Sequence, residues 1–127
     1  MKTTELELHI HSICKKNNIS IQFYTGNGRA WRKNRLIKIR MVKSPVTYAI
    51  ALHEIGHILG KQSGNRLNKE VQAWQWAIQN ALMWNNTMEV KKKQSLHSYL
   101  IWCKTRKGAW IPPSNHPAWE MAGVTPP

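Results

Sequence analysis

The segment from Ser44 to Gly60 decides the fold, and it reads SPVTYAIALHEIGHILG. Ser44 is a good helix N-cap, and Pro45 then occupies the first helical position, where its missing N–H leaves no hydrogen bond unmade. Gly60 is typical of a helix C-terminus. Because the residues between these ends are apolar nearly all round, the helix is expected to be buried. The segment is too short to span a membrane, so we predict a core helix.

This helix contains an H-E-x-x-H motif made by His53, Glu54 and His57. Residues four apart lie on one face of a helix, so His53 and His57 can present two imidazoles to one metal ion. Zinc suits two imidazoles plus one carboxylate, with an open position for a water molecule whose pKa it lowers. Glu54 would then take the proton from that water and later pass it to the leaving group. The alternative is a chance match with two core histidines, although ionisable groups in a buried helix need partners.

Glu70 is the candidate third ligand, in the first turn of a helix that we predict over about Leu67–Trp84. Ala73 lies one turn further on the same face, and its small side chain would let this helix approach the central helix closely. The alternative role for Glu70 is an acid that interacts favourably with the helix dipole. The remaining acids are poorly placed for a metal site, and they are Glu5, Glu7, Glu89 and Glu120. We expect the buried face of this helix to contain Leu67, Val71, Trp74, Ile78, Ala81 and Leu82.

The residues before the central helix predict one helix and a small sheet. Thr4–Glu7 reads as a capping box for a helix that ends near Lys16, with His9 and His11 on the surface. Its apolar stripe consists of Leu6, Ile10, Ile13 and Cys14. The segments Ile19–Tyr24 and Arg35–Val42 read as two strands, which we expect to pair as an antiparallel hairpin with a long basic tip.

The residues after Trp84 predict a fourth helix and a tail. Glu89 can complete its cap, and Lys91–Lys93 are expected to face water. Its predicted buried residues are Val90, Leu96, Leu100 and Cys103. The predicted fold class is α+β, with four main helices and a small antiparallel sheet before the central helix. One domain is expected over residues 1–106, followed over 107–127 by an extended tail rich in proline and tryptophan, which Trp110 and Trp119 can pin to the surface.

The charge balance is strongly basic. The 127 residues include 19 Lys and Arg but only six acids, all glutamate, which gives a net charge of +13. Such a surface favours polyanions or acidic protein partners and would bind nucleic acid with strong salt dependence. The basic hairpin Arg29–Lys43 contains Trp31, which can stack on bases. A competing function is therefore a basic nucleic-acid-binding protein with a structural or inactive zinc site. A third alternative is an inactive decoy, against which the intact Glu54 argues.

The sequence shows no long apolar run and no signal-peptide pattern at its start, so we expect a soluble cytoplasmic protein without membrane contact. Cys14 and Cys103 fit no metal or redox spacing and are expected to be reduced, buried thiols. For an oxyanion donor, Tyr48, His97 and Tyr99 are available, and the sequence does not choose among them. His116 can in principle reach the metal from the tail.

The HEIGH motif, the apolar turn after it and the later Glu-x-x-Ala helix together resemble the ImmA/IrrE-type zinc metallopeptidases. The resemblance covers about Leu36–Leu82 and is greatest to small stand-alone members carried by phages and prophages. It implies a minimal zincin-like fold in which His53, His57 and Glu70 hold zinc and Glu54 is the general base. It also implies hydrolysis of a peptide bond in a protein partner, and the best understood relatives cut a DNA-bound repressor. In such folds the free edge of the strand before the motif helix takes the substrate as an added strand, and Arg35–Val42 is the candidate. A phage-encoded member would act in the cytoplasm of the host cell.

Overall fold

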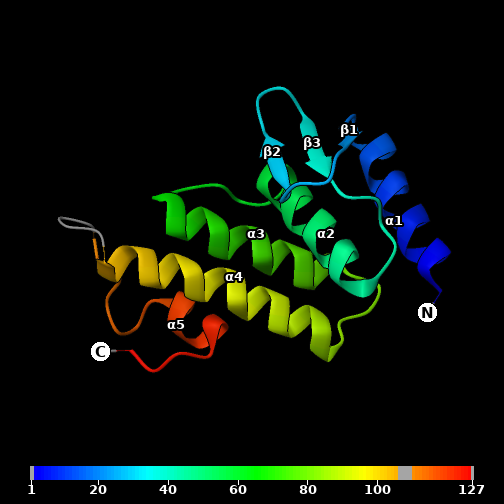
Figure 1. Cartoon of the computed structure of the whole chain (residues 1–127). Helices are drawn as coiled ribbons and strands as arrows, with labels where there is room; N and C mark the ends of the chain where they lie inside the picture. The colour runs from blue at the N-terminus through cyan, green and yellow to red at the C-terminus, as the bar shows by residue number, and fades with distance from the viewer. Residues whose placement is uncertain (1, 106–109, 127) are drawn as a thin grey trace.

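Helix α2 (Pro45–Leu59) is the central element of the computed structural model, which describes residues 2–105 and 110–126. A small sheet and α1 (Thr3–Lys16) lie on one side of α2, while α3 (Arg66–Asn80) and α4 (Asn86–Thr105) lie on the other (Figure 1). A short fifth helix, α5 (Pro117–Ala122), packs against α4 and α3. The class is α+β, as predicted, and α2 contacts both the sheet and the helices around it.

The ends of α2 lie where the local sequence signals place them. The Ser44 hydroxyl accepts the Thr47 N–H at 3.1 Å, while the Thr47 hydroxyl oxygen accepts the Ser44 N–H at 2.9 Å. This reciprocal capping box satisfies backbone donors that the first turn leaves without partners. Pro45 follows at the first position, and Gly60 is the C-cap. The predicted core helix is confirmed, because most of its apolar side chains are fully buried.

The sheet has three strands, β1 (Ser20–Phe23), β2 (Arg29–Trp31) and β3 (Leu36–Ile39), in the order β1-β3-β2 among the described residues. β1 runs parallel to β3, while β2 runs antiparallel to β3. The predicted antiparallel hairpin between the first and last of these segments is therefore wrong, because the basic connection between them supplies a strand of its own. The predicted substrate edge is also wrong, since β3 is the central strand and the open edge beside α2 belongs to β2.

Helix α1 buries Leu6, Ile10 and Cys14, in agreement with the predicted stripe. The predicted capping box at its start is wrong: the N-cap is Lys2, whose side chain makes no capping bond, and Thr4 lies inside the helix. His9 is half-buried rather than on the surface, because its ring contacts the Tyr48 hydroxyl.

Helix α3 ends at Asn80, earlier than predicted, and its buried face is rotated toward smaller residues. Ile78 and Leu82 are exposed, whereas Ala73 and Ala77 are fully buried. The reason is the close approach of α3 to α2, which only small side chains allow.

Helix α4 begins at Asn86 and buries Leu96, Leu100 and Cys103, as predicted. The expectations for Val90 and Lys92 are wrong, since Val90 is exposed and Lys92 is buried. The Lys92 ammonium lies 3.0 Å from the Glu89 carboxylate, which compensates its burial.

The predicted extended tail is wrong for residues 117–122, which form α5. Trp119 is 2 % exposed and joins the hydrophobic core, and its indole N–H donates to the Pro113 carbonyl oxygen at 2.9 Å. Trp110 is about half exposed. The predicted domain boundary after residue 106 lies outside the described residues. Within the described ranges, no helix combines the length and apolar character that a membrane crossing requires.

Candidate metal site

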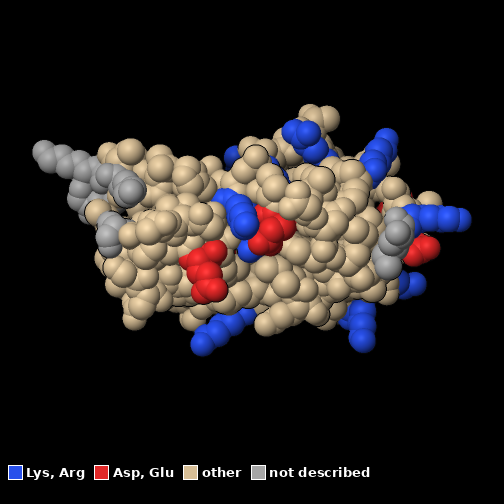
Figure 2. Space-filling model, turned by 90° about the horizontal axis from the view of Figure 1, so that it is seen from below, with Lys and Arg blue, Asp and Glu red and all other residues tan. Residues whose placement is uncertain are grey.

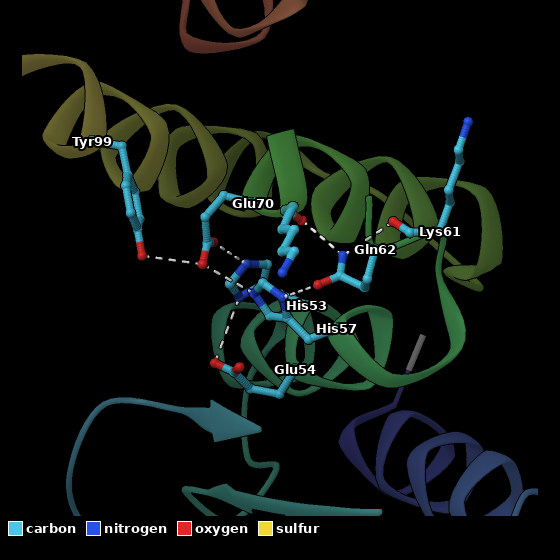
Figure 3. A network of polar contacts seen from close by, with 8 residues as sticks. His53, Glu54, His57, Lys61, Gln62, Glu70 and Tyr99 are labelled. Carbon is cyan, nitrogen blue, oxygen red and sulfur yellow. Dashed lines mark hydrogen bonds and ion pairs between the residues drawn. The ribbon is translucent and has the colours of Figure 1, made fainter. Parts of the chain in front are cut away.

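Two helices bring the three predicted ligands together. His53 and His57 come from successive turns of α2, and Glu70 comes from the first half of α3 (Figure 3). The His53 Nε2 atom lies 2.7 Å from Glu70 Oε2, and the His57 Nε2 atom lies 3.1 Å from Glu70 Oε1. The ligand atoms of the three residues all lie within 4.8 Å of one another. This group could hold a metal ion.

The donor set and its spacing fit a divalent transition metal. Ligand atoms held at roughly 2.0–2.2 Å in tetrahedral geometry stand about 3.3–3.6 Å apart. The two observed imidazole–carboxylate separations, 2.7 and 3.1 Å, are about 0.6 and 0.2 Å shorter than the lower end of this range. A small outward movement of one carboxylate would therefore make room for an ion. Two imidazole nitrogens and one carboxylate oxygen form a set that such metals accept.

The spacing between α2 and α3 depends on Gly56, which lies inside the HEIGH motif. A Cβ atom on Gly56 would lie 2.5 Å from the Ala73 carbonyl oxygen and 3.1 Å from the Ala73 Cα atom. The backbones of the two helices therefore touch at this point. Because Glu70 lies one turn before Ala73 on α3, this contact brings its carboxylate to the imidazole pair.

Glu54 lies beside this group of ligands and not within it. Its side chain is buried, and Oε2 lies 3.6 Å from Nδ1 of His53, the ring nitrogen that does not face Glu70. On its other side it meets Gly28, where a Cβ atom would lie 2.5 Å from Oε2. The carboxylate is thus held between the central helix and the start of β2.

Gln62 orients one ligand, and the sequence alone did not indicate it. The His57 Nδ1–H donates to Gln62 Oε1 at 2.9 Å, which leaves Nε2 directed at the carboxylate of Glu70. The Gln62 amide in turn donates to the carbonyl oxygens of Lys69 at 2.9 Å and Lys61 at 3.2 Å. Such outer contacts fix the tautomer and direction of a ligating histidine. The only signal was a polar side chain in the loop after the motif helix, where Lys61, Ser63 and Asn65 are polar as well.

Tyr99 and Trp74 hold the other two ligands. The Tyr99 hydroxyl donates to Glu70 Oε1 at 3.1 Å, so α4 also contributes to the site (Figure 3). The Trp74 ring stacks on the His53 ring, with centroids 4.2 Å apart and planes at 16°. The sequence predicted Trp74 as a core residue and left Tyr99 unplaced.

The electrostatics of the site favour an ionised carboxylate. Burial alone would raise the pKa of Glu70, but hydrogen bonds and charge interactions with His53 and His57 hold it well below its usual range. Burial alone would lower the pKa of His53, but its interactions with Glu54 and Glu70 raise it to about 9. The same negative charges that favour a proton on His53 also attract a divalent cation, so proton and metal compete for this ring.

The other candidates from the sequence lie away from the ligands. Tyr48 is fully buried, and its hydroxyl accepts the Leu82 N–H at 3.0 Å and contacts His9. His97 is exposed and does not line the cavity over the site. His116 accepts the Ala118 N–H as the cap of α5 and contacts Asn68, so it does not reach the metal ligands.

A cavity of about 1160 Å³ lies over the site. Its lining includes His53, Glu54, His57 and Glu70 together with residues of β2, α3 and α4. The candidate ligands thus line this cavity, which we call the groove. Comparison of the chain with protein-family models, curated proteins and solved structures finds no match. The function is therefore argued from the site itself.

Proposed function

We propose that this chain is a zinc-dependent metallopeptidase with a zincin-like fold, which hydrolyses a peptide bond in a protein partner. The observation that carries the proposal is the convergence of His53, His57 and Glu70, with the Glu54 carboxylate beside them in one groove. The resemblance to ImmA/IrrE-type enzymes agrees with it. A phage or prophage origin, a DNA-bound repressor as substrate and the host cytoplasm as compartment stay predictions of that resemblance.

In this proposal His53, His57 and Glu70 hold the ion. When bound, zinc supplies Lewis-acid chemistry that lowers the pKa of a water molecule and polarises a carbonyl group. Glu54 would act as the general base that takes a proton from the attacking water as its oxygen adds to the peptide carbonyl carbon. Glu54 then delivers the proton to the amide nitrogen as the C–N bond breaks, leaving a new carboxyl group and a new amine.

The strand β2 supports the proposal because it offers an open edge beside the catalytic groups. Residues 28–32 line the cavity, and β2 is an edge strand with β3 on its other side. An extended peptide can add to such an edge through backbone hydrogen bonds. A substrate bound there would pass Gly28 and hence Glu54, which Gly28 contacts.

Nucleic-acid binding by the basic segment 29–43 is the second candidate. Arg29, Trp31 and Arg32 are exposed on or next to β2, and the Lys38 ammonium lies 5.6 Å from the centroid of the Trp31 ring. Exposed cations next to an aromatic ring suit phosphates and bases. A filter-binding titration at two salt concentrations tests it, and absence of binding at low salt would reject this candidate.

The decisive test of the peptidase proposal compares Glu54→Gln with the parent protein. We expect about one zinc per chain in both proteins by elemental mass spectrometry, but loss of cleavage in the variant when digests of host proteins are compared. The control is Glu120→Gln, which neutralises an exposed acid of α5 outside the cavity. Cleavage by Glu54→Gln at the parent rate would refute the catalytic assignment.

A further inference from the structure

The groove over the candidate site has an unusual charge distribution. Among the described residues that line it, the carboxylates are Glu54 and Glu70, both part of the site. The cations that line the groove are Arg29, Arg32, Arg40, Arg66, Lys69 and Lys91. Among the described residues that line the groove, cations therefore outnumber carboxylates, and both carboxylates belong to the candidate site.

These six cations form no ion pair with any carboxylate that the structure describes. Arg32 and Arg40 donate to backbone carbonyl oxygens at 3.4 and 3.2 Å, which orients them without neutralising their charge. The Arg66 guanidinium lies 5.4 Å from the centroid of the Tyr99 ring, whose hydroxyl donates to the Glu70 carboxylate. A ligand with negative charges would meet all of these groups unneutralised.

The basic charge is not spread evenly over the molecule. Figure 2 shows the side that lies below α4 and α5 in Figure 1. Neutral residues dominate this side, and Lys and Arg lie mostly near its edges. Six of the 19 Lys and Arg residues line the groove, against two of the six glutamates.

Cations stand on both walls of the groove. Arg29, Arg32 and Arg40 come from the sheet side, while the other three come from α3 and α4. A peptide added to β2 would run between these walls, and its successive side chains would point to opposite sides. Carboxylates on both sides of the scissile bond could then reach cations on either wall.

We propose that the groove recognises an acidic peptide segment, in which Asp or Glu residues flank the bond that is cut. This inference rests on the proposed peptidase function and adds a substrate class to it. A peptide fits better than a nucleic acid, because a phosphodiester backbone has no N–H donors for the open edge of β2.

The test measures binding to the zinc-loaded Glu54→Gln protein by fluorescence anisotropy, so that it does not depend on cleavage. The probes are labelled peptides of equal length that carry Glu, Gln or Lys at the same positions, and a single-stranded oligonucleotide of the same charge as the Glu peptide. We expect the Glu peptide to bind about tenfold or more tightly than the Gln peptide, with affinity falling as salt rises.

Two triple variants separate a local effect from net charge. Arg29→Gln, Lys69→Gln and Lys91→Gln together remove three cations of the groove. Lys2→Gln, Lys15→Gln and Lys16→Gln remove the same charge from exposed positions at the ends of α1, outside the groove. Each exposed ion pair contributes roughly two- to fivefold, so the first variant should weaken binding of the Glu peptide about tenfold or more. The second should change it less than about twofold, because exposed charges further than a Debye length are largely screened.

Each result decides the inference. Equal losses in the two triple variants, equal affinity for the Glu and Gln peptides, or tighter binding of the oligonucleotide would overturn it. Circular dichroism checks that both variants are folded. Binding of the Glu peptide without its cleavage by the parent protein would instead refute the peptidase proposal and leave the preference of the groove for acidic peptides intact.

Discussion

Replacing Gly56 by alanine tests whether the backbone contact between α2 and α3 sets the metal site. The new Cβ atom would lie 2.5 Å from the Ala73 carbonyl oxygen, which belongs to a helix backbone and cannot rotate away. A carbon–oxygen contact relaxes to about 3.3 Å, so α3 would have to move by roughly 0.8 Å. Because Glu70 is carried on the same helix, its carboxylate would move away from His53 and His57 by a similar distance.

The expected magnitude follows from two opposing effects. Overpacking against a backbone atom costs up to about 3 kcal/mol, whereas the helix preference of Ala over Gly contributes about 1 kcal/mol in the opposite direction. We therefore expect Gly56→Ala to lower the free energy of unfolding by about 2 kcal/mol. For a chain of this size the thermal midpoint, Tm, should fall by about 6–10 °C. A shift of about 0.8 Å would carry the His57–Glu70 separation of 3.1 Å beyond the spacing of two ligands of one ion, so zinc binding should weaken about tenfold or more.

Two measurements separate packing from metal binding. Thermal unfolding in the presence of a chelator reports the packing effect, and competition with a chromophoric chelator reports zinc affinity. Gly26→Ala is the matched control, because its Cβ atom would meet the Tyr24 ring at 2.6 Å, a side chain that can move. A raised Tm together with unchanged zinc affinity in Gly56→Ala would show that the helix contact does not position Glu70.

Four further predictions follow from contacts around the site. Gly28→Ala places a Cβ atom 2.5 Å from Glu54 Oε2, so cleavage should fall at least tenfold while zinc content, measured on the same sample, stays at the parent value. Gln62→Ala removes the oxygen that accepts the N–H of the His57 imidazole. The affinity for zinc, measured by competition with a chelator, should fall about 10- to 100-fold. Tyr99→Phe should lower the affinity for zinc less, by about two- to tenfold, because it removes one hydrogen bond from a neutral hydroxyl to the Glu70 carboxylate. An unchanged affinity would show that this hydrogen bond does not hold Glu70 in place. Removing the metal with a chelator should lower the free energy of unfolding by about 4 kcal/mol, compared with the protein in zinc at a thousandfold excess over its Kd. A Tm that does not depend on zinc would show that the folded protein does not bind zinc at this site.

The central helix could be predicted from sequence because its signals are local. The capping serine, the proline at the first position and the terminal glycine each act on backbone groups only a few residues away, and the structure confirms all three. The sheet could not be predicted in the same way. β1 pairs with β3, which lies more than ten residues further along the chain, and no local signal specifies that pairing. The short strand Arg29–Trp31 also shows no clear alternation of apolar and polar residues.

The two histidines could be predicted because the motif spacing places them on one face of α2, and Glu70 because it lies near the start of the next helix beside a small residue, Ala73. The side chains that support these three residues depend on tertiary structure. Gln62 and Tyr99 reach the site only because of where a loop and α4 lie. The buried face of α3 was misplaced for a related reason. Ile78 is more apolar than Ala77, yet the close contact with α2 selects the smaller side chain for burial.

The stacking of Trp74 on His53 makes the intrinsic fluorescence of Trp74 a probe of the candidate site. Because the indole contacts the ring of a candidate ligand, binding of an ion to that ring should alter the emission of Trp74. Titration of the ion could then be followed in unlabelled protein, with Trp74→Phe identifying which of the seven tryptophans responds.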